Sequence, residues 1–143
     1  MSPATRCKAE TLLTEAALRR TPPRIAVLQV LLNAREPLNQ DQITARLDRD
    51  APNKVTVYRT LQALCAAGIV HRAFVQKRTW YFESAERCTE HQCHPHFTCT
   101  GCGRTTCLAE MRLPAVARSY KGYTIQRQRV QLEGLCPECR EGK

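Results

Sequence analysis

The chain has 143 residues, of which 43% are hydrophobic, so it is long enough for one ordinary domain or two small ones. Its formal net charge of +9 favours a polyanionic partner, although such a charge also serves solubility. No window holds the roughly 18 apolar residues of a membrane span, and the start of the chain lacks the apolar core of a signal peptide. We therefore expect a cytoplasmic protein without a membrane partner.

The composition divides the chain into two halves. Residues 1–82 carry 13 Lys and Arg against 6 Asp and Glu, whereas residues 83–143 carry 9 against 7. Seven of the nine cysteines and three of the four histidines lie from Cys88 onward. In a reducing compartment these residues indicate metal binding or redox chemistry rather than a disulfide framework. We expect a polyanion-binding domain followed by a metal-binding domain, with the boundary near Ser84–Gln92.

Three helices are expected in the first 50 residues. The first is a short amphipathic segment, Ala9–Arg20. The second begins at Thr21-Pro22-Pro23, where a proline suits the first helical turn, and runs to Ala34. The third follows Asn39, a suitable N-cap, and has apolar residues at helical spacing.

A fourth helix, Asn53–Ala67, contains no acidic residue and ends at Gly68. Two β-prone runs, residues 69–75 and 79–84, follow it and are separated by a basic tip, which predicts a hairpin. This order is typical of a winged helix-turn-helix, whose second motif helix enters the DNA major groove. A solvated basic helix is the alternative, but the basic hairpin favours DNA binding. The predicted DNA-binding residues are Lys54, Thr56, Tyr58, Arg59, Gln62, Lys77 and Arg78.

Two C-x-x-C pairs, Cys99/Cys102 and Cys136/Cys139, are separated by 33 residues. Four thiolates that close around one ion form a structural zinc site without an open position. A redox dithiol is the alternative for a single pair, but two pairs that frame one small domain favour zinc. A zinc deaminase is excluded, because the chain lacks both H-x-E and P-C-x-x-C.

The 33 residues between the cysteine pairs leave room for a small α/β insert. We expect a strand over Arg104–Glu110, a helix over Leu113–Lys121 and strands through Tyr123–Leu135. The apolar phase slips within the last stretch, which predicts a bend or a second hairpin around Gln126–Arg129.

Four stretches together form a specific pattern: TPPRIAVLQVL, NKVTVYRTLQALCAAGIV, HPHFTCTGCG and EGLCPEC. Over nearly its whole length the chain resembles the ferric uptake regulator family of metal-dependent bacterial repressors. The resemblance implies a dimer with an N-terminal winged helix and a C-terminal α/β dimerisation domain. It also implies a sensor metal site near the hinge, whose occupancy sets the DNA-binding domains for a palindromic operator.

The resemblance implies regulatory metal ligands from both halves of the chain, at His71, Glu83, His94, His96 and Cys107. Cys88 or Cys93 is an alternative to Glu83, because the stretch before His94 is longer than usual in the family.

Three departures from the family pattern bear on the sensed metal. Pro37 stands where iron sensors have a histidine, and Pro95 and Gln128 alter the accessory metal site. Cys107 adds a soft thiolate that suits zinc or copper(I) better than iron or manganese. The zinc uptake regulator branch is therefore favoured over the iron and peroxide branches.

The sequence thus predicts an α/β (α+β) protein that is not an enzyme. Residues 1–83 form a winged-helix DNA-binding domain, residues 84–93 a hinge, and residues 94–143 a dimerisation domain with the four-cysteine zinc site. We expect a zinc-sensing repressor that binds a double-stranded DNA operator as a homodimer and has no small-molecule substrate other than its metal ion. An iron-, manganese- or peroxide-sensing regulator and a thiol-based redox sensor are the alternatives.

Overall fold

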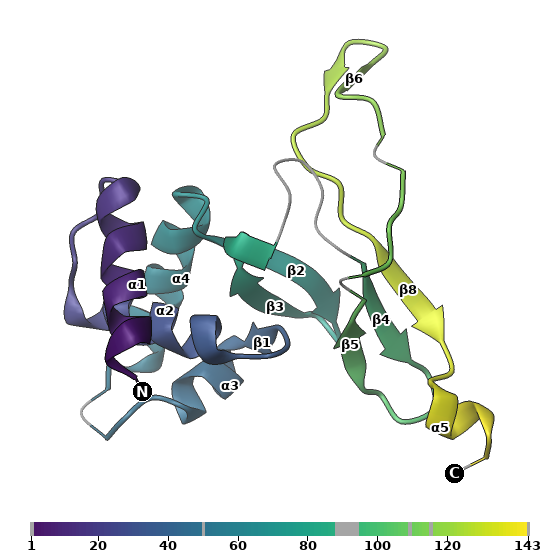
Figure 1. The fold of residues 1–143 in the computed structure, drawn as a ribbon, viewed down its shortest axis with the longest axis horizontal. Coiled ribbons are helices and arrows are strands. Elements are labelled where there is room, and N and C mark those ends of the chain that lie inside the picture. Colours follow the sequence, from purple (N-terminus) through teal and green to yellow (C-terminus); the bar gives the residue numbers. More distant parts are fainter. Residues whose placement is uncertain (1, 50, 88–94, 109, 115, 143) are drawn as a thin grey trace. The chain divides into compact units, whose positions relative to one another are not determined.

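The computed structural model describes residues 2–49, 51–87, 95–108, 110–114 and 116–142. The chain forms two compact units, Met1–Glu86 and Arg87–Lys143, each described by itself below. The first unit consists of helices and a long hairpin, and the second mainly of short strands (Figure 1). No helix in the described ranges is both long and apolar enough to cross a membrane.

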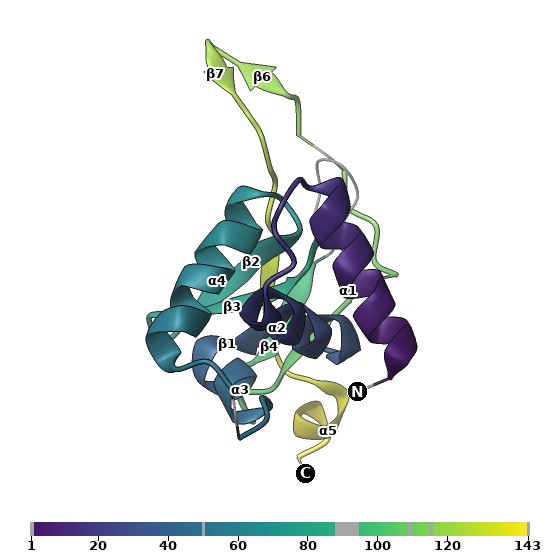
Figure 2. The same cartoon turned by 90° about the vertical axis from the view of Figure 1, so that its left-hand side faces the viewer.

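The helices of the first unit pack around a central one. They are α1 (Pro3–Glu15), α2 (Pro22–Asn33), α3 (Gln40–Ala45) and α4 (Lys54–Ala66). α1 and α4 lie on either side of α2 (Figure 2). Val27, Leu28 and Leu31 are at most 1% exposed, so α2 is buried on several faces rather than along one stripe. Its apolar sequence therefore forms the centre of the hydrophobic core.

The hairpin forms the wing of the first unit, as the two β-prone runs predict. It consists of β2 (Val70–Gln76) and β3 (Thr79–Ser84), and a short strand β1 (Leu38–Asn39) pairs with the outer side of β3 in the order β1-β3-β2. A 3₁₀ turn, Ala85–Arg87, follows β3. The helix-turn-helix and hairpin arrangement is confirmed, while β1 is too short for periodicity to reveal.

The predicted bounds of the first helix are wrong. α1 begins at Pro3, because the side chain of Ser2 accepts a hydrogen bond from Thr5 N over 3.2 Å and a proline occupies the first turn. It ends at Glu15, and Ala17 adopts a left-handed backbone with φ of 58°. The bounds of α2, the Asn39 cap of α3 and the Gly68 end of α4 agree with the sequence predictions.

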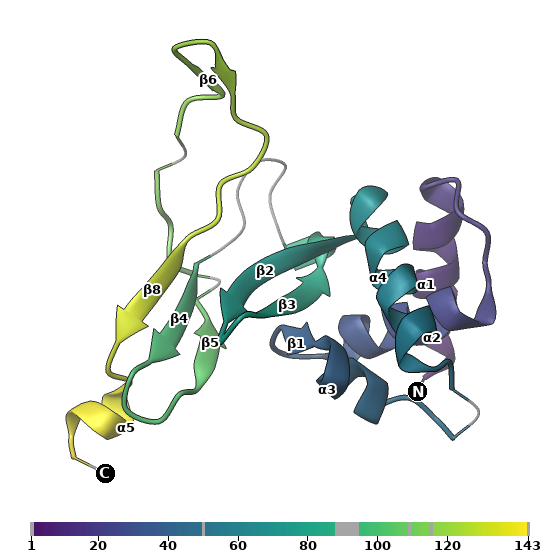
Figure 3. The same cartoon turned by 180° about the vertical axis from the view of Figure 1, so that it is seen from behind.

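The second unit contains a three-stranded sheet and a separate hairpin. Its sheet has the order β5-β4-β8, in which β4 (His96–Cys99) pairs antiparallel with β5 (Thr105–Cys107) and parallel with β8 (Gln131–Gly134). The hairpin of β6 (Ser119–Tyr120) and β7 (Tyr123–Thr124) projects from the sheet, and the short helix α5 (Pro137–Arg140) follows β8 (Figure 3). The predicted break around residues 126–129 is confirmed, because β7 and β8 are separate strands.

The predicted helix Leu113–Lys121 is wrong for the described residues of that range. Val116 is 55% exposed, so a helix here would bury little apolar surface, and a helix this short is marginal without tertiary packing. Gln128 also binds the backbone instead: Val116 N donates to its Oε1 over 2.8 Å, and its Nε2 donates to Pro114 O over 3.3 Å. These two bonds connect Pro114 and Val116 to Gln128.

Candidate metal centre and nucleic-acid interface

The four predicted structural zinc ligands lie together. The Sγ atoms of Cys99, Cys102, Cys136 and Cys139 are all within 4.8 Å of one another, and those of Cys102 and Cys136 are 4.0 Å apart. A tetrahedral zinc ion with Zn–S bonds of about 2.3 Å places its sulfurs about 3.8 Å apart. Both the spacing and the soft donor chemistry of this cluster therefore fit a zinc ion.

The parallel pairing of β4 and β8 brings the two cysteine pairs to one end of the sheet. Cys99 ends β4 opposite Gly134 at the end of β8, and Thr100 N donates to Gly134 O over 2.7 Å. Gly101 allows a close approach between the first two ligands, because a Cβ there would lie 3.0 Å from Cys139 Sγ. The fold itself thus builds the site from segments 33 residues apart in the sequence.

Backbone donors and neighbouring sulfurs make the four thiols unequal. Cys102 N and Cys136 N donate to Cys99 Sγ over 3.5 and 3.3 Å, and these bonds lower the pKa of Cys99 from 9.0 to about 6. Hydrogen bonds with the side chain of Cys136, then with that of Cys99, raise the pKa of Cys139 to about 12. Full ionisation near neutral pH therefore requires a nearby cation, which a bound zinc ion would supply.

Two of the predicted regulatory ligands face each other in the second unit. His96 of β4 pairs in register with Cys107 of β5. His96 is 1% exposed and Cys107 is half-buried. An imidazole and a thiol on adjacent strands form a donor pair suited to zinc.

Two further predicted ligands face each other in the first unit. His71 of β2 is in register with Glu83 of β3, and its Nε2 lies 2.7 Å from Glu83 Oε1. Both side chains are at most 2% exposed. Such a pair is suited to metal binding. The two buried polar side chains can also satisfy each other without a metal ion. The other predicted ligands, His94, Cys88 and Cys93, lie outside the described residues.

The predicted DNA-binding residues of α4 share its solvent face. Lys54, Tyr58, Arg59 and Gln62 are exposed and Thr56 is half-buried. On the opposite face, Val57 and Leu61 are buried.

Contacts with α3 anchor the start of α4. Gln40 Nε2 donates to Lys54 O over 2.8 Å, and Lys54 Nζ lies 2.9 Å from Asp41 Oδ1. The solvent face of α4 also carries Val55, which is 57% exposed and which a search for polar side chains missed. Val55 lies three residues before Tyr58, and this spacing alone places the two side chains on the same helix face.

The tip of the wing presents two cations on an unusual backbone. Lys77 and Arg78 are exposed and have φ of 49° and 64°. This is the backbone of a type I′ turn, for which Asn-Gly is the usual sequence. Two long basic side chains thus occupy positions that disfavour them, which is common where function outweighs local stability.

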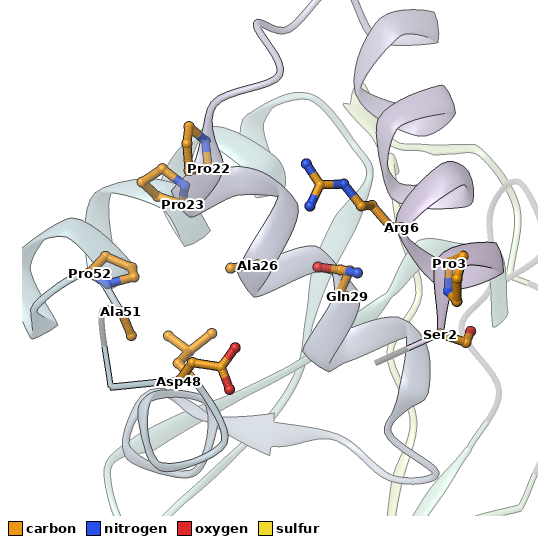
Figure 4. Close-up of a pocket in the computed structure, with 11 residues that line it drawn as sticks. Ser2, Pro3, Arg6, Pro22, Pro23, Ala26, Gln29, Asp48, Ala51 and Pro52 are labelled. Atoms are coloured by element: carbon orange, nitrogen blue, oxygen red, sulfur yellow. The ribbon is translucent and has the colours of Figure 1, made fainter.

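A hollow of about 680 Å³ lies in the first unit near the N-terminal ends of α1 and α2 (Figure 4). Prolines and small residues line much of it, with Arg6, Gln29 and Asp48 at its polar positions. None of the residues predicted to bind metal or DNA lines this hollow. The candidate sites are therefore the sulfur cluster, the two donor pairs and the surface of α4 with the wing.

Comparison with known proteins agrees with this architecture. Residues 15–133 match the ferric uptake regulator family. The chain is 29% identical over 136 residues to the peroxide-responsive repressor PerR of Staphylococcus aureus, covering 90% of this chain and 87% of that protein.

Solved structures of regulators have the same fold. The ferric uptake regulator of Vibrio cholerae has a TM-score of 0.63 at 23% identity, covering 89% of this chain and 98% of that one. A zinc uptake regulator complexed with zinc and DNA has a TM-score of 0.61 at 21% identity, covering 97% and 95%. The family match spans most of the chain, so this protein belongs to the ferric uptake regulator family of metal-responsive, DNA-binding transcription regulators.

Proposed function

We propose that this protein is a zinc-responsive repressor that binds a palindromic operator as a zinc-loaded homodimer and controls genes of metal uptake and homeostasis. One observation carries the choice of zinc: Cys107 stands opposite His96 across β4 and β5. A thiolate beside an imidazole favours zinc or copper(I), whereas iron(II) and manganese(II) sensors benefit from oxygen-rich ligand sets.

In this proposal the two parts of the chain have different roles. Residues 1–83 bind DNA through α4 and the tip of the wing, and residues 84–93 act as a hinge. Residues 94–143 dimerise and hold a permanent zinc ion on the four cysteines. That ion contributes folding free energy under all conditions and is not the sensor.

A second, exchangeable zinc ion is the switch. We assign it to His71 and Glu83 of the wing together with His94, His96 and Cys107, with Cys88 or Cys93 as an alternative to Glu83. Because these ligands belong to two domains, the bound ion restrains the orientation of the DNA-binding domain. Zinc and operator then strengthen each other's binding by the same factor, typically about 1–3 kcal/mol.

The choice of metal is tested by measuring operator affinity at matched free concentrations of zinc, iron(II), manganese(II) and copper(I). We expect zinc to support binding at the lowest free concentration. Operator binding that responds to iron(II) or manganese(II) but not to zinc would overturn the zinc assignment.

A peroxide-responsive regulator is the second candidate, because the similarity to PerR covers 90% of this chain. Exposure of the iron(II)-loaded protein to hydrogen peroxide separates the two. Peroxide-dependent loss of operator binding supports this second candidate. Operator binding that depends on zinc and does not change with peroxide supports the first.

Native mass spectrometry tests the remaining redox alternative. Two zinc ions per chain support the metal switch. One zinc ion together with a readily formed disulfide between Cys88 and Cys93 supports a thiol sensor.

A further inference from the structure

The exposed face of α4 carries a hydrogen-bonded side-chain pair. Gln62 Nε2 donates to Tyr58 Oη over 2.9 Å. The two residues are four positions apart and therefore lie on the same helix face. Both are exposed, Tyr58 by 48%, so the pair presents its remaining hydrogen-bonding groups to a partner of the helix.

The remaining groups of the Gln62 amide can be counted. An amide has two N–H donors and one carbonyl acceptor, and one donor is used by Tyr58 Oη. One N–H and Oε1 remain on the same planar group, and the bond to Tyr58 restrains its orientation. In the major groove adenine presents one acceptor, N7, beside one donor, the N6 amino group. The two sets match one to one.

The other bases match this arrangement less well. Guanine presents two acceptors, N7 and O6, so Gln62 Oε1 would face an acceptor. Thymine presents O4 and a methyl group, and cytosine presents its N4 amino group, so each leaves part of the amide without a partner. A buried amide group that lacks a partner at an interface lowers affinity.

We infer that Gln62 reads an adenine in the major groove and that the Tyr58 hydroxyl positions the Gln62 amide to do so. The inference deepens the proposed function and rests on α4 being the DNA-reading helix. It distinguishes Gln62 from a cation that contacts only phosphates, because a phosphate contact carries no sequence information.

The test begins with the zinc-loaded full chain and a random duplex library, from which the preferred operator is selected. Affinities are then measured for every single-base change of that operator, at one salt concentration. The wild-type protein is compared with Gln62→Ala, Gln62→Glu and Tyr58→Phe. Lys77→Ala at the tip of the wing is the matched control, because loss of a phosphate contact weakens binding to all sequences alike.

In the wild-type protein we expect replacement of one adenine in each half-site to weaken binding by about 5- to 150-fold. Gln62→Ala abolishes the preference at that position and leaves the other positions unchanged. Gln62→Glu shifts the preference there toward cytosine, because a carboxylate accepts from the N4 amino group. Tyr58→Phe keeps the ring but reduces the same preference, which a purely structural role of the hydroxyl would not do.

Three outcomes would overturn parts of the account, and they differ from one another. If Gln62→Ala retains every base preference of the wild-type protein, adenine reading is wrong although DNA binding stands. If Tyr58→Phe leaves the preference at that position intact, the positioning role is wrong. If the zinc-loaded wild-type protein selects no operator, both the proposed function and this inference fail.

Discussion

The two units of the chain differ in how many apolar residues they bury. The cluster of buried apolar residues lies wholly within the first unit, from Ala9 to Phe82. In the described part of the second unit, Cys99 is the sole member of the buried hydrophobic set. Five of its larger apolar side chains are 43–72% exposed: Met111, Val116, Tyr120, Tyr123 and Leu135. The first unit therefore has an apolar core of its own, and the proposed zinc ion and homodimer would account for the stability of the second unit.

Removal of the structural zinc is expected to have the largest effect on the stability of the second unit relative to the first. Chelation, or Cys102→Ser, is expected to unfold the second unit and leave the first folded, because a structural zinc ion contributes about 10–16 kcal/mol. Two-dimensional amide NMR spectra should lose the dispersed signals of residues beyond Arg87 alone. Cys7→Ser, at an exposed position of α1, is the control. Loss of both units together would contradict the separate origins of their stability.

A core substitution should produce the opposite pattern. Leu28 is fully buried in α2, so Leu28→Ala is expected to destabilise the first unit by about 2–5 kcal/mol. The structural zinc should stay bound, because no ligand of the sulfur cluster lies in that unit. Chemical denaturation of protein that holds only the structural zinc, followed with a zinc-release assay, measures both. Release of the structural zinc at the lowered unfolding midpoint would show that the two units share one cooperative transition.

A smaller change tests how tightly the sulfur cluster is built. A Cβ at Gly101 would lie 3.0 Å from Cys139 Sγ, so Gly101→Ala is expected to weaken structural zinc binding about 10- to 100-fold. Competition with a chromophoric chelator measures this effect. Thr106→Ala, at an exposed position of β5, should bind zinc like the wild-type protein. Equal zinc affinities of the two variants would mean that the turn accommodates the added methyl group without weakening zinc binding.

The wing offers the smallest effect, in which stability and binding change in opposite directions. Replacing Lys77-Arg78 with Asn-Gly relieves two left-handed residues and should stabilise the first unit by about 1–2 kcal/mol. Operator binding should weaken, and the salt slope should fall by about 1.8 if both cations contact phosphates. Thermal unfolding and salt-dependent binding check the two parts. An unchanged salt slope would remove the wing tip from the DNA interface.

The same contrast explains how far the sequence could predict the fold. In the first unit the apolar residues at regular spacing are buried, and Asn39, Asn53 and Gly68 mark helix ends. The helices α3 and α4 and the hairpin were therefore predictable. The start of α1 was not, because its cap at Ser2 lies ahead of the apolar pattern. In the second unit the helix over residues 113–121 was predicted wrongly, because little apolar surface is buried there.

The candidate sites were predictable to different degrees. The C-x-x-C spacing was enough to predict that four sulfurs meet, because that chemistry needs specific residues at short range. The register of His96 with Cys107 and of His71 with Glu83 required strand pairing, which the sequence alone does not determine. The hydrogen bond between Gln62 and Tyr58 also emerged only from side-chain geometry.

We propose that one exchangeable zinc ion couples the two units to operator binding, and substitution of His96 removes one ligand of that ion. Operator affinity is measured against buffered free zinc for the wild-type protein and for His96→Ala, with the structural zinc retained in both. We predict that zinc raises the affinity of the wild-type protein about 5- to 150-fold, and that His96→Ala remains a folded dimer with a flat response. A zinc response of His96→Ala equal to that of the wild-type protein would contradict the account.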